Sequence, residues 1–190
     1  MPIFCLWVRS APIFLFSEEF SMANRSRHLT HAAIIAALYA VLTHMQNLLL
    51  PNSASMMIQF RLSEALCVLA FFTPAAIPGL TVGCLLFNIT SAGALPLDWL
   101  LGSFATFLAA SGMWASRRIT LGSLPLPGLL LPAVTNALLV GWELAVYIGG
   151  GFWLNAMYVA IGEVTVLLIL GSALYYAIRL RHLDTRLFGI

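Results

Sequence analysis

A nearly continuous apolar sequence from Gln59 to Leu170 constrains the fold of this chain more than any other feature. Of the 190 residues, 61% are hydrophobic and only 8% are charged, which is far from the balance of a soluble domain. The mean hydropathy of +0.96 agrees with this composition. Because a helix that crosses a bilayer needs about 20 apolar residues, the chain is predicted to be an all-α integral membrane protein with room for six helices.

Proline, glycine and asparagine interrupt the apolar sequence and divide it into six predicted helices. The second helix is short, since at about 1.5 Å per residue it cannot cross a bilayer of ~30 Å. We expect it to be inserted only half-way. The predicted helices are 31–50, 62–72, 78–92, 97–116, 129–148 and 152–177.

The predicted helices form a single transmembrane domain over residues 28–180, followed by a cytoplasmic tail at residues 181–190. Residues 1–27 are predicted to be an extension that is poorly ordered or absent from the native protein. The apolar run in this extension is interrupted by Arg9 and Pro12, so it is a poor membrane span and a poor secretory signal.

The arginines predict the orientation of the chain in the membrane. The chain has no lysine, and its arginines outside the apolar helices form clusters before the first helix, after the fourth and after the sixth. With six crossings these clusters fall on one side, which the positive-inside rule assigns to the cytoplasm. Both termini are therefore predicted to be cytoplasmic in a multi-pass protein of the cell membrane. The clustered residues are Arg25, Arg27, Arg117, Arg118, Arg179, Arg181 and Arg186.

Polar and charged residues within the apolar sequence predict a binding pocket. Ionisable groups in hydrocarbon cost several kcal/mol, so they usually face a cavity, a partner or a ligand. In the predicted orientation they converge on the outer half of the membrane, where one arginine opposes several acids. Such a pocket favours a small ligand that is cationic or rich in hydrogen-bond donors. The candidate ligand-binding residues are Gln59, Arg61, Glu64, Asp98, Asn136, Glu143, Trp153, Asn155 and Glu163.

Spacing supports shared faces on the last two helices. Asn136 and Glu143 are separated by seven residues, and Asn155 and Glu163 by eight, so the members of each pair lie roughly two turns apart on similar sides of a helix. No basic residue in the fifth or sixth helix can pair with Glu143 or Glu163. These two acids are therefore the strongest candidates for ligand contact.

Several candidates also have structural interpretations. Arg61 and Glu64 are three residues apart and can neutralise one another. Asp98 precedes a predicted helix, and its role can be merely that of an N-cap. Trp153 can belong to an interfacial aromatic belt.

Blocks of sequence distributed along the chain occur in the order found in a known family. They are Ile58–Leu66, Phe71–Leu80, Gly83–Asn88, Asn136–Leu144, Phe152–Val159 and Gly162–Glu163. In these blocks the chain resembles the QueT family from about His31 to Leu174. Members of this family are S-components, the substrate-binding subunits of energy-coupling factor (ECF) transporters, assigned to queuosine precursors.

The resemblance implies a six-helix S-component bundle that captures a 7-deazaguanine from outside and docks onto a transmembrane coupling subunit powered by two ATPases. Because the chain has no Walker A sequence, ATP hydrolysis is expected in a partner. Small residues on the first helix resemble the surface that meets the coupling subunit, although they could equally pack within the chain. These residues are Ala32, Ala33, Ala36, Ala37 and Ala40.

Other functions are less well supported by the sequence. The histidines lie at the ends of the predicted helices and the cysteines lack metal-ligand spacing, so we expect no enzyme, no metal and no cofactor. Nucleic-acid binding is disfavoured by a net charge of only +2. The main alternative is a standalone secondary transporter of a nucleobase-like or cationic solute, coupled to protons through Glu143 or Glu163.

Overall fold

Helices form every regular element in the part of the chain that the structure describes, which confirms the predicted all-α class. The structure is a computed structural model that describes residues 4–51, 60–92, 94–95 and 97–185, with side chains from residue 25 onward. The elements are α1 (Phe4–Leu49), η1 (Leu62–Phe71), α2 (Ala76–Thr90), α3 (Asp98–Ser116), α4 (Leu126–Leu129), α5 (Leu131–Tyr147), α6 (Phe152–Val166), η2 (Leu167–Gly171) and α7 (Ser172–Leu180).

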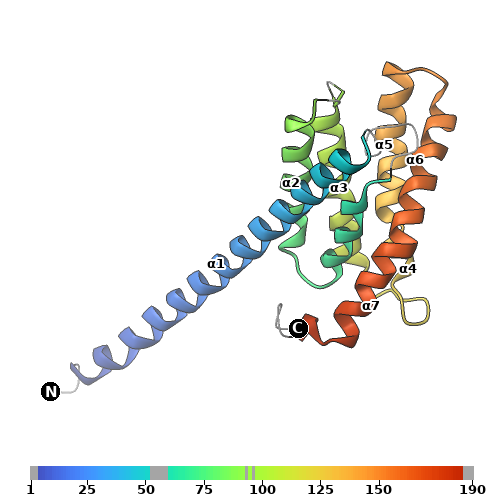
Figure 1. Cartoon of the computed structure of the whole chain (residues 1–190). Coiled ribbons are helices and arrows are strands. Elements are labelled where there is room, and N and C mark those ends of the chain that lie inside the picture. Colours follow the sequence, from blue (N-terminus) through green and yellow to red (C-terminus); the bar gives the residue numbers. More distant parts are fainter. Residues whose placement is uncertain (1–3, 52–59, 93, 96, 186–190) are drawn as a thin grey trace.

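The observed elements follow the predicted ones except at the start of the chain and at α4, a short helix in the predicted connection between the fourth and fifth helices. η1 is the short second segment and forms a tight 3-10 helix, while α6, the π-helical turn η2 and α7 together make the sixth. The prediction for the first helix was wrong at its start, because α1 begins at Phe4 and not near His31. Figure 1 shows the N-terminal part of α1 extending away from the bundle.

The helices differ in their ability to cross a membrane unaided. In the described residues, three stretches are long and apolar enough, namely Arg25–Leu49, Leu126–Tyr147 and Phe152–Leu180. η1 and α2 are apolar but shorter. The outside of the bundle carries large apolar side chains such as Leu100, Ile169 and Trp153, whereas the charged side chains of Arg61, Glu64, Asp98, Glu143 and Glu163 lie inside it. This distribution is typical of a membrane helical bundle.

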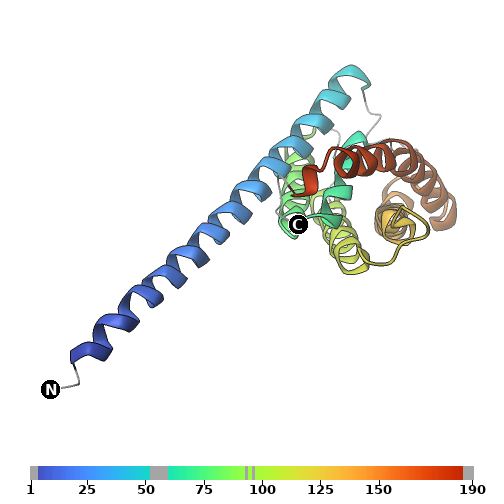
Figure 2. The same cartoon turned by 90° about the horizontal axis from the view of Figure 1, so that it is seen from below.

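η1 lies at the centre of the arrangement. It contacts α1, α2, α3, α6 and α7, while α1, α2, α3, α5 and α6 follow one another around the bundle, each in contact with the next (Figure 2). Most residues of η1 are buried as a result. The charged residues in and beside η1 are therefore placed among side chains from several other helices.

Glycines allow α5 and α6 to approach closely. A Cβ atom at Gly141 would lie 2.7 Å from the Cα atom of Ala156 on α6, which is closer than real Cβ atoms come to backbone. A similar approach joins α1 and α2, where a Cβ atom at Gly83 would lie 2.8 Å from the carbonyl oxygen of Ala36. These contacts fix the positions of the helices that carry the candidate site.

Replacing Gly141 with valine is expected to lower the thermal midpoint of the purified protein by about 3–10 °C, because overpacking costs about 1–3 kcal/mol in a chain of this size. The midpoint can be measured by thermal unfolding in detergent. Ala115→Val is the control, since Ala115 is exposed on α3 and has room for a larger side chain. Equal midpoints for the two variants would contradict the tight contact between α5 and α6.

Candidate ligand-binding site

Buried polar side chains gather around η1, and we call this group the polar cluster. No member exposes more than 7% of its surface, although each has a side chain that water would solvate well. Burial of this many polar groups is costly unless they bind one another or a ligand. The members of the polar cluster are Arg61, Glu64, Asp98, Asn136, Glu143 and Glu163.

Arg61 is the central cation of the polar cluster. It lies directly before η1, and its guanidinium interacts electrostatically with all the acids of the cluster and with Tyr39. One guanidinium carries a single positive charge, so it cannot neutralise every one of these acids in the ionised form. The acids are Glu64, Asp98, Glu143 and Glu163.

Glu64 is held by donors from the protein itself. The hydroxyl of Tyr39 on α1 donates to Oε1 of Glu64 at 2.5 Å, and the thiol of Cys67 donates to Oε2 at 3.1 Å. Both carboxylate oxygens therefore have partners, in addition to the nearby charge of Arg61. This geometry favours the structural interpretation of the Arg61–Glu64 pair. Tyr39 was not among the predicted site residues; its hydroxyl lies on the same buried face of α1 as Thr43 and Gln46.

Asp98 is the first residue of α3 and holds the turn before it. Its Oδ2 accepts a hydrogen bond from the backbone N–H of Leu95 at 2.7 Å, and its backbone carbonyl accepts one from Nδ2 of Asn88 at 2.8 Å. The N-cap position belongs to Leu97. The interpretation of Asp98 as an N-cap was therefore wrong. Its carboxyl group also interacts electrostatically with that of Glu143 on α5.

The face shared by α5 and α6 is rich in acceptors. Nδ2 of Asn136 donates to Oε1 of Glu163 at 3.0 Å. In the part of the chain that the structure describes, the other oxygen of Glu163, Oδ1 of Asn136 and both oxygens of Glu143 have no hydrogen-bond partner. A buried acceptor without a donor costs about 1–3 kcal/mol. This face can therefore gain stability from a ligand that brings N–H or O–H groups.

The remaining candidates do not join the polar cluster. Asn155 is buried, but its Nδ2 donates to the carbonyls of Gly149 and Gly151 at 2.7 and 3.1 Å and so holds the turn between α5 and α6. Its Oδ1 has no partner in the described residues. Trp153 is 75% exposed and lines an apolar groove on the outside of α5 and α6. Gln59 lies outside the described residues.

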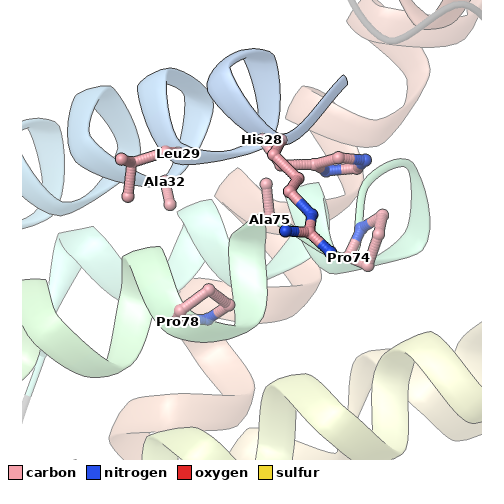
Figure 3. Close-up of a pocket in the computed structure, with 7 residues that line it drawn as sticks. His28, Leu29, Ala32, Pro74, Ala75 and Pro78 are labelled. Carbon is pink, nitrogen blue, oxygen red and sulfur yellow. The ribbon is translucent and has the colours of Figure 1, made fainter. Parts of the chain in front are cut away.

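The alanines of α1 are divided between two environments. Ala36 is buried against α2 beside Gly83, whereas Ala33 and Ala37 are exposed. Ala32 lines an apolar groove between α1 and the start of α2, together with His28, Leu29, Pro74, Ala75 and Pro78 (Figure 3). Packing within the chain therefore accounts for part of the stripe, and the rest remains on the surface.

Comparison with known proteins agrees with the resemblance found in the sequence. A family model described as "QueT transporter" matches residues 29–180, which is most of the chain. No curated protein and no solved structure matches the chain. The match confirms the predicted family, and together with the apolar exterior it identifies a membrane transport protein.

Proposed function

We propose, because this chain belongs to the QueT transporter family, that it is the S-component of an ECF-type importer for a queuosine precursor. It captures a 7-deazaguanine base from outside the cell membrane and delivers it through a coupling subunit driven by two partner ATPases. The observation that best supports this proposal is the group of buried acceptors on α5 and α6 that have no donor in the described residues.

The edge of a guanine-like base complements these acceptors. It presents a ring N–H beside an exocyclic amine, and one carboxylate can accept both donors in parallel. Glu163 is the best-placed carboxylate for this role, because Asn136 already holds one of its oxygens and the other has no partner in the described chain. Oδ1 of Asn136 can accept a further hydrogen bond from the ligand.

The distribution of arginines between the two ends of the bundle supports capture of the ligand from outside the cell. In Figure 1 the end of α2, the start of α3 and the turn between α5 and α6 lie at one end, while the turn between η1 and α2, the end of α3 and the end of α7 lie at the other. Arg117 and Arg118 at the end of α3, Arg179 in α7 and Arg25, which lines a groove beside Pro74, lie at this second end. The positive-inside rule predicts that this end is cytoplasmic, and Asp98 and Glu143 are then expected towards the outside.

A standalone proton-coupled transporter is the second candidate, because the buried Glu143 has neither carboxylate oxygen bound to a donor in the described residues. Co-purification distinguishes the two. An S-component brings down a large membrane subunit and its ATPases, and its transport stops when those ATPases are disabled. A standalone transporter continues to work without them.

A binding assay tests the proposed substrate class. Purified protein in detergent is titrated with deazaguanine bases, guanine and unrelated vitamins. We expect only the deazaguanines to bind tightly, and Glu163→Gln to weaken their binding at least tenfold, which corresponds to ~1.4 kcal/mol. Asp184→Asn is the control. Asp184 pairs with Arg179 near the end of α7, and no residue of the polar cluster lies in that part of the sequence.

Two results would count against the proposal. Absence of binding to every deazaguanine would overturn the substrate class. Unchanged affinity in Glu163→Gln would remove this residue from the site and leave the substrate class standing.

A further inference from the structure

We infer that Gln46 of α1 is a positioning residue of the proposed ligand site, because its side chain fixes the backbone on both sides of Arg61. This role rests on the proposed function, since it concerns the binding of the same ligand. It goes beyond that function by assigning control of Arg61 to α1, a helix that contributes no residue to the polar cluster. Gln46 is expected to set the affinity of the site without touching the ligand.

The side-chain amide of Gln46 binds the two peptide groups that flank Arg61. Nε2 of Gln46 donates to the carbonyl oxygen of Phe60, and Oε1 of Gln46 accepts the backbone N–H of Leu62 at 2.8 Å. Gln46 is 4% exposed, so water has little access to its amide. A primary amide has both donors and acceptors, so one side chain can satisfy both peptide groups. The backbone on either side of Arg61 is therefore tied to α1.

Hydrogen bonds within η1 do not hold this part of the backbone by themselves. Arg61 has extended dihedral angles, with φ −84° and ψ 99°, and η1 begins only at Leu62. The first N–H groups of a helix have no acceptor within the helix, so the N–H of Leu62 needs one from elsewhere. Gln46 supplies that acceptor from a different helix, while the carbonyl of Arg61 accepts the N–H of Glu64 at 3.0 Å. The position of Arg61 thus depends on α1 as well as on η1.

The side chain of Arg61 extends from this anchored backbone to α3. Its Nη1 lies 3.9 Å from the position that a Cβ atom at Gly102 would take. Arg61 is 3% exposed, and its guanidinium interacts electrostatically with Glu64 and Asp98. Groups that bind a ligand must be held to within about 0.5 Å by the residues that support them. Release of the backbone beside Arg61 would therefore move the guanidinium relative to the acids of the polar cluster and lower the affinity for the ligand.

Thr43 provides a matched control on the same face of α1. Its hydroxyl donates to the hydroxyl of Ser63 at 2.7 Å, and both residues are completely buried. This bond joins the same two segments, α1 and η1, but it acts through the side chain of Ser63 and not through the backbone beside Arg61. If Gln46 only stabilised the fold, loss of its bonds and loss of the Thr43 bond would have similar effects on the site. A positioning role predicts that only the loss of Gln46 alters Arg61.

Gln46→Met and Thr43→Val are compared with wild type on the purified full chain in detergent. The thermal midpoint is expected to fall in both variants, because each loses buried hydrogen bonds. Binding of 7-deazaguanine should weaken by about fivefold or more in Gln46→Met and by less than about twofold in Thr43→Val. NMR of protein labelled with ¹⁵N-arginine follows the Nε–H group of Arg61 directly, with its signal assigned as the one that Arg61→Lys lacks. This signal should shift in Gln46→Met and stay in place in Thr43→Val.

Either of two results would overturn the positioning role, namely an Arg61 signal that does not shift in Gln46→Met or equal losses of affinity in Gln46→Met and Thr43→Val. Failure of every deazaguanine to bind wild type would instead overturn the proposed function, and the Arg61 signal would still decide whether Gln46 positions Arg61. If Gln46→Met does not fold, Gln46→Asn decides the question. Its amide is one methylene shorter and cannot reach both Phe60 and Leu62, so the same shift and loss of affinity are expected, and an unchanged signal there rules the role out.

Discussion

Replacing Arg61 with methionine is expected to destabilise the protein by about 3–5 kcal/mol, the effect of removing one partner from a buried ion pair. Methionine retains much of the apolar stem but removes the charge that the acids of the polar cluster share. In a chain of this size the loss corresponds to a fall of about 6–20 °C in the thermal midpoint. Thermal unfolding in detergent measures it, and the yield of monodisperse protein should fall in parallel.

Two further variants show whether buried charge is the cause. Adding Glu64→Gln to Arg61→Met removes one of the uncompensated acids, so the double variant should recover part of the lost stability. Arg179→Met is the matched surface control. The side chain of Arg179 is 57% exposed and lies 3.5 Å from Asp184, and such pairs contribute about 0–1 kcal/mol. Equal effects of Arg61→Met and Arg179→Met would show that Arg61 is not the balancing charge of the cluster.

The sequence alone predicts most helix boundaries, because prolines and glycines mark them. The predicted fourth and fifth helices, 97–116 and 129–148, differ from α3 and α5 by at most two residues at either end. Glycine also explains the sharp turn before α6, where Gly149, Gly150 and Gly151 all have positive φ. Proline and glycine end a helix through their local backbone geometry, so these helix ends can be recognised without knowledge of the fold.

The faces on which polar residues lie are harder to predict. Asn136 and Glu143 are seven residues apart, which returns to nearly the same side of a helix, and both are buried in the polar cluster. Trp153 and Asn155 are only two residues apart, so they point in nearly opposite directions at about 100° per residue. The structure accordingly has Trp153 outside and Asn155 inside. Helical geometry alone therefore separates this pair.

Partners from distant parts of the chain cannot be predicted from local pattern. The donor that holds Glu64 is Tyr39, 25 residues earlier in the chain. Similarly, Thr43 of α1 donates to the hydroxyl of Ser63 at 2.7 Å. These contacts exist because α1 packs against η1, and no spacing in either segment indicates the pairing. The division of the acids into those with internal donors and those without therefore required the three-dimensional structure.

The exposed alanines of α1 lead to the second large expected effect. Ala37→Trp should reduce uptake to the background level in cells that contain the coupling subunit and ATPases, while the affinity of the purified chain for its ligand stays within about twofold. Ala33 and Ala37 are exposed, whereas Ala36 faces α2. Small side chains permit the close approach of another helix in lipid, and a bulky indole at Ala37 prevents it. Uptake of labelled base and binding in detergent provide the two measurements.

The proposed coupling is tested by the difference between uptake and binding. Ala115→Trp places the same side chain at an exposed alanine of α3 and should leave uptake closer to wild type. Normal uptake in Ala37→Trp would show that this face of α1 does not meet the coupling subunit. Loss of binding as well as uptake would instead indicate a role inside the bundle, because α1 also carries Tyr39, which holds Glu64. A docking surface at Ala33 and Ala37 is supported only if Ala37→Trp loses uptake and retains ligand binding.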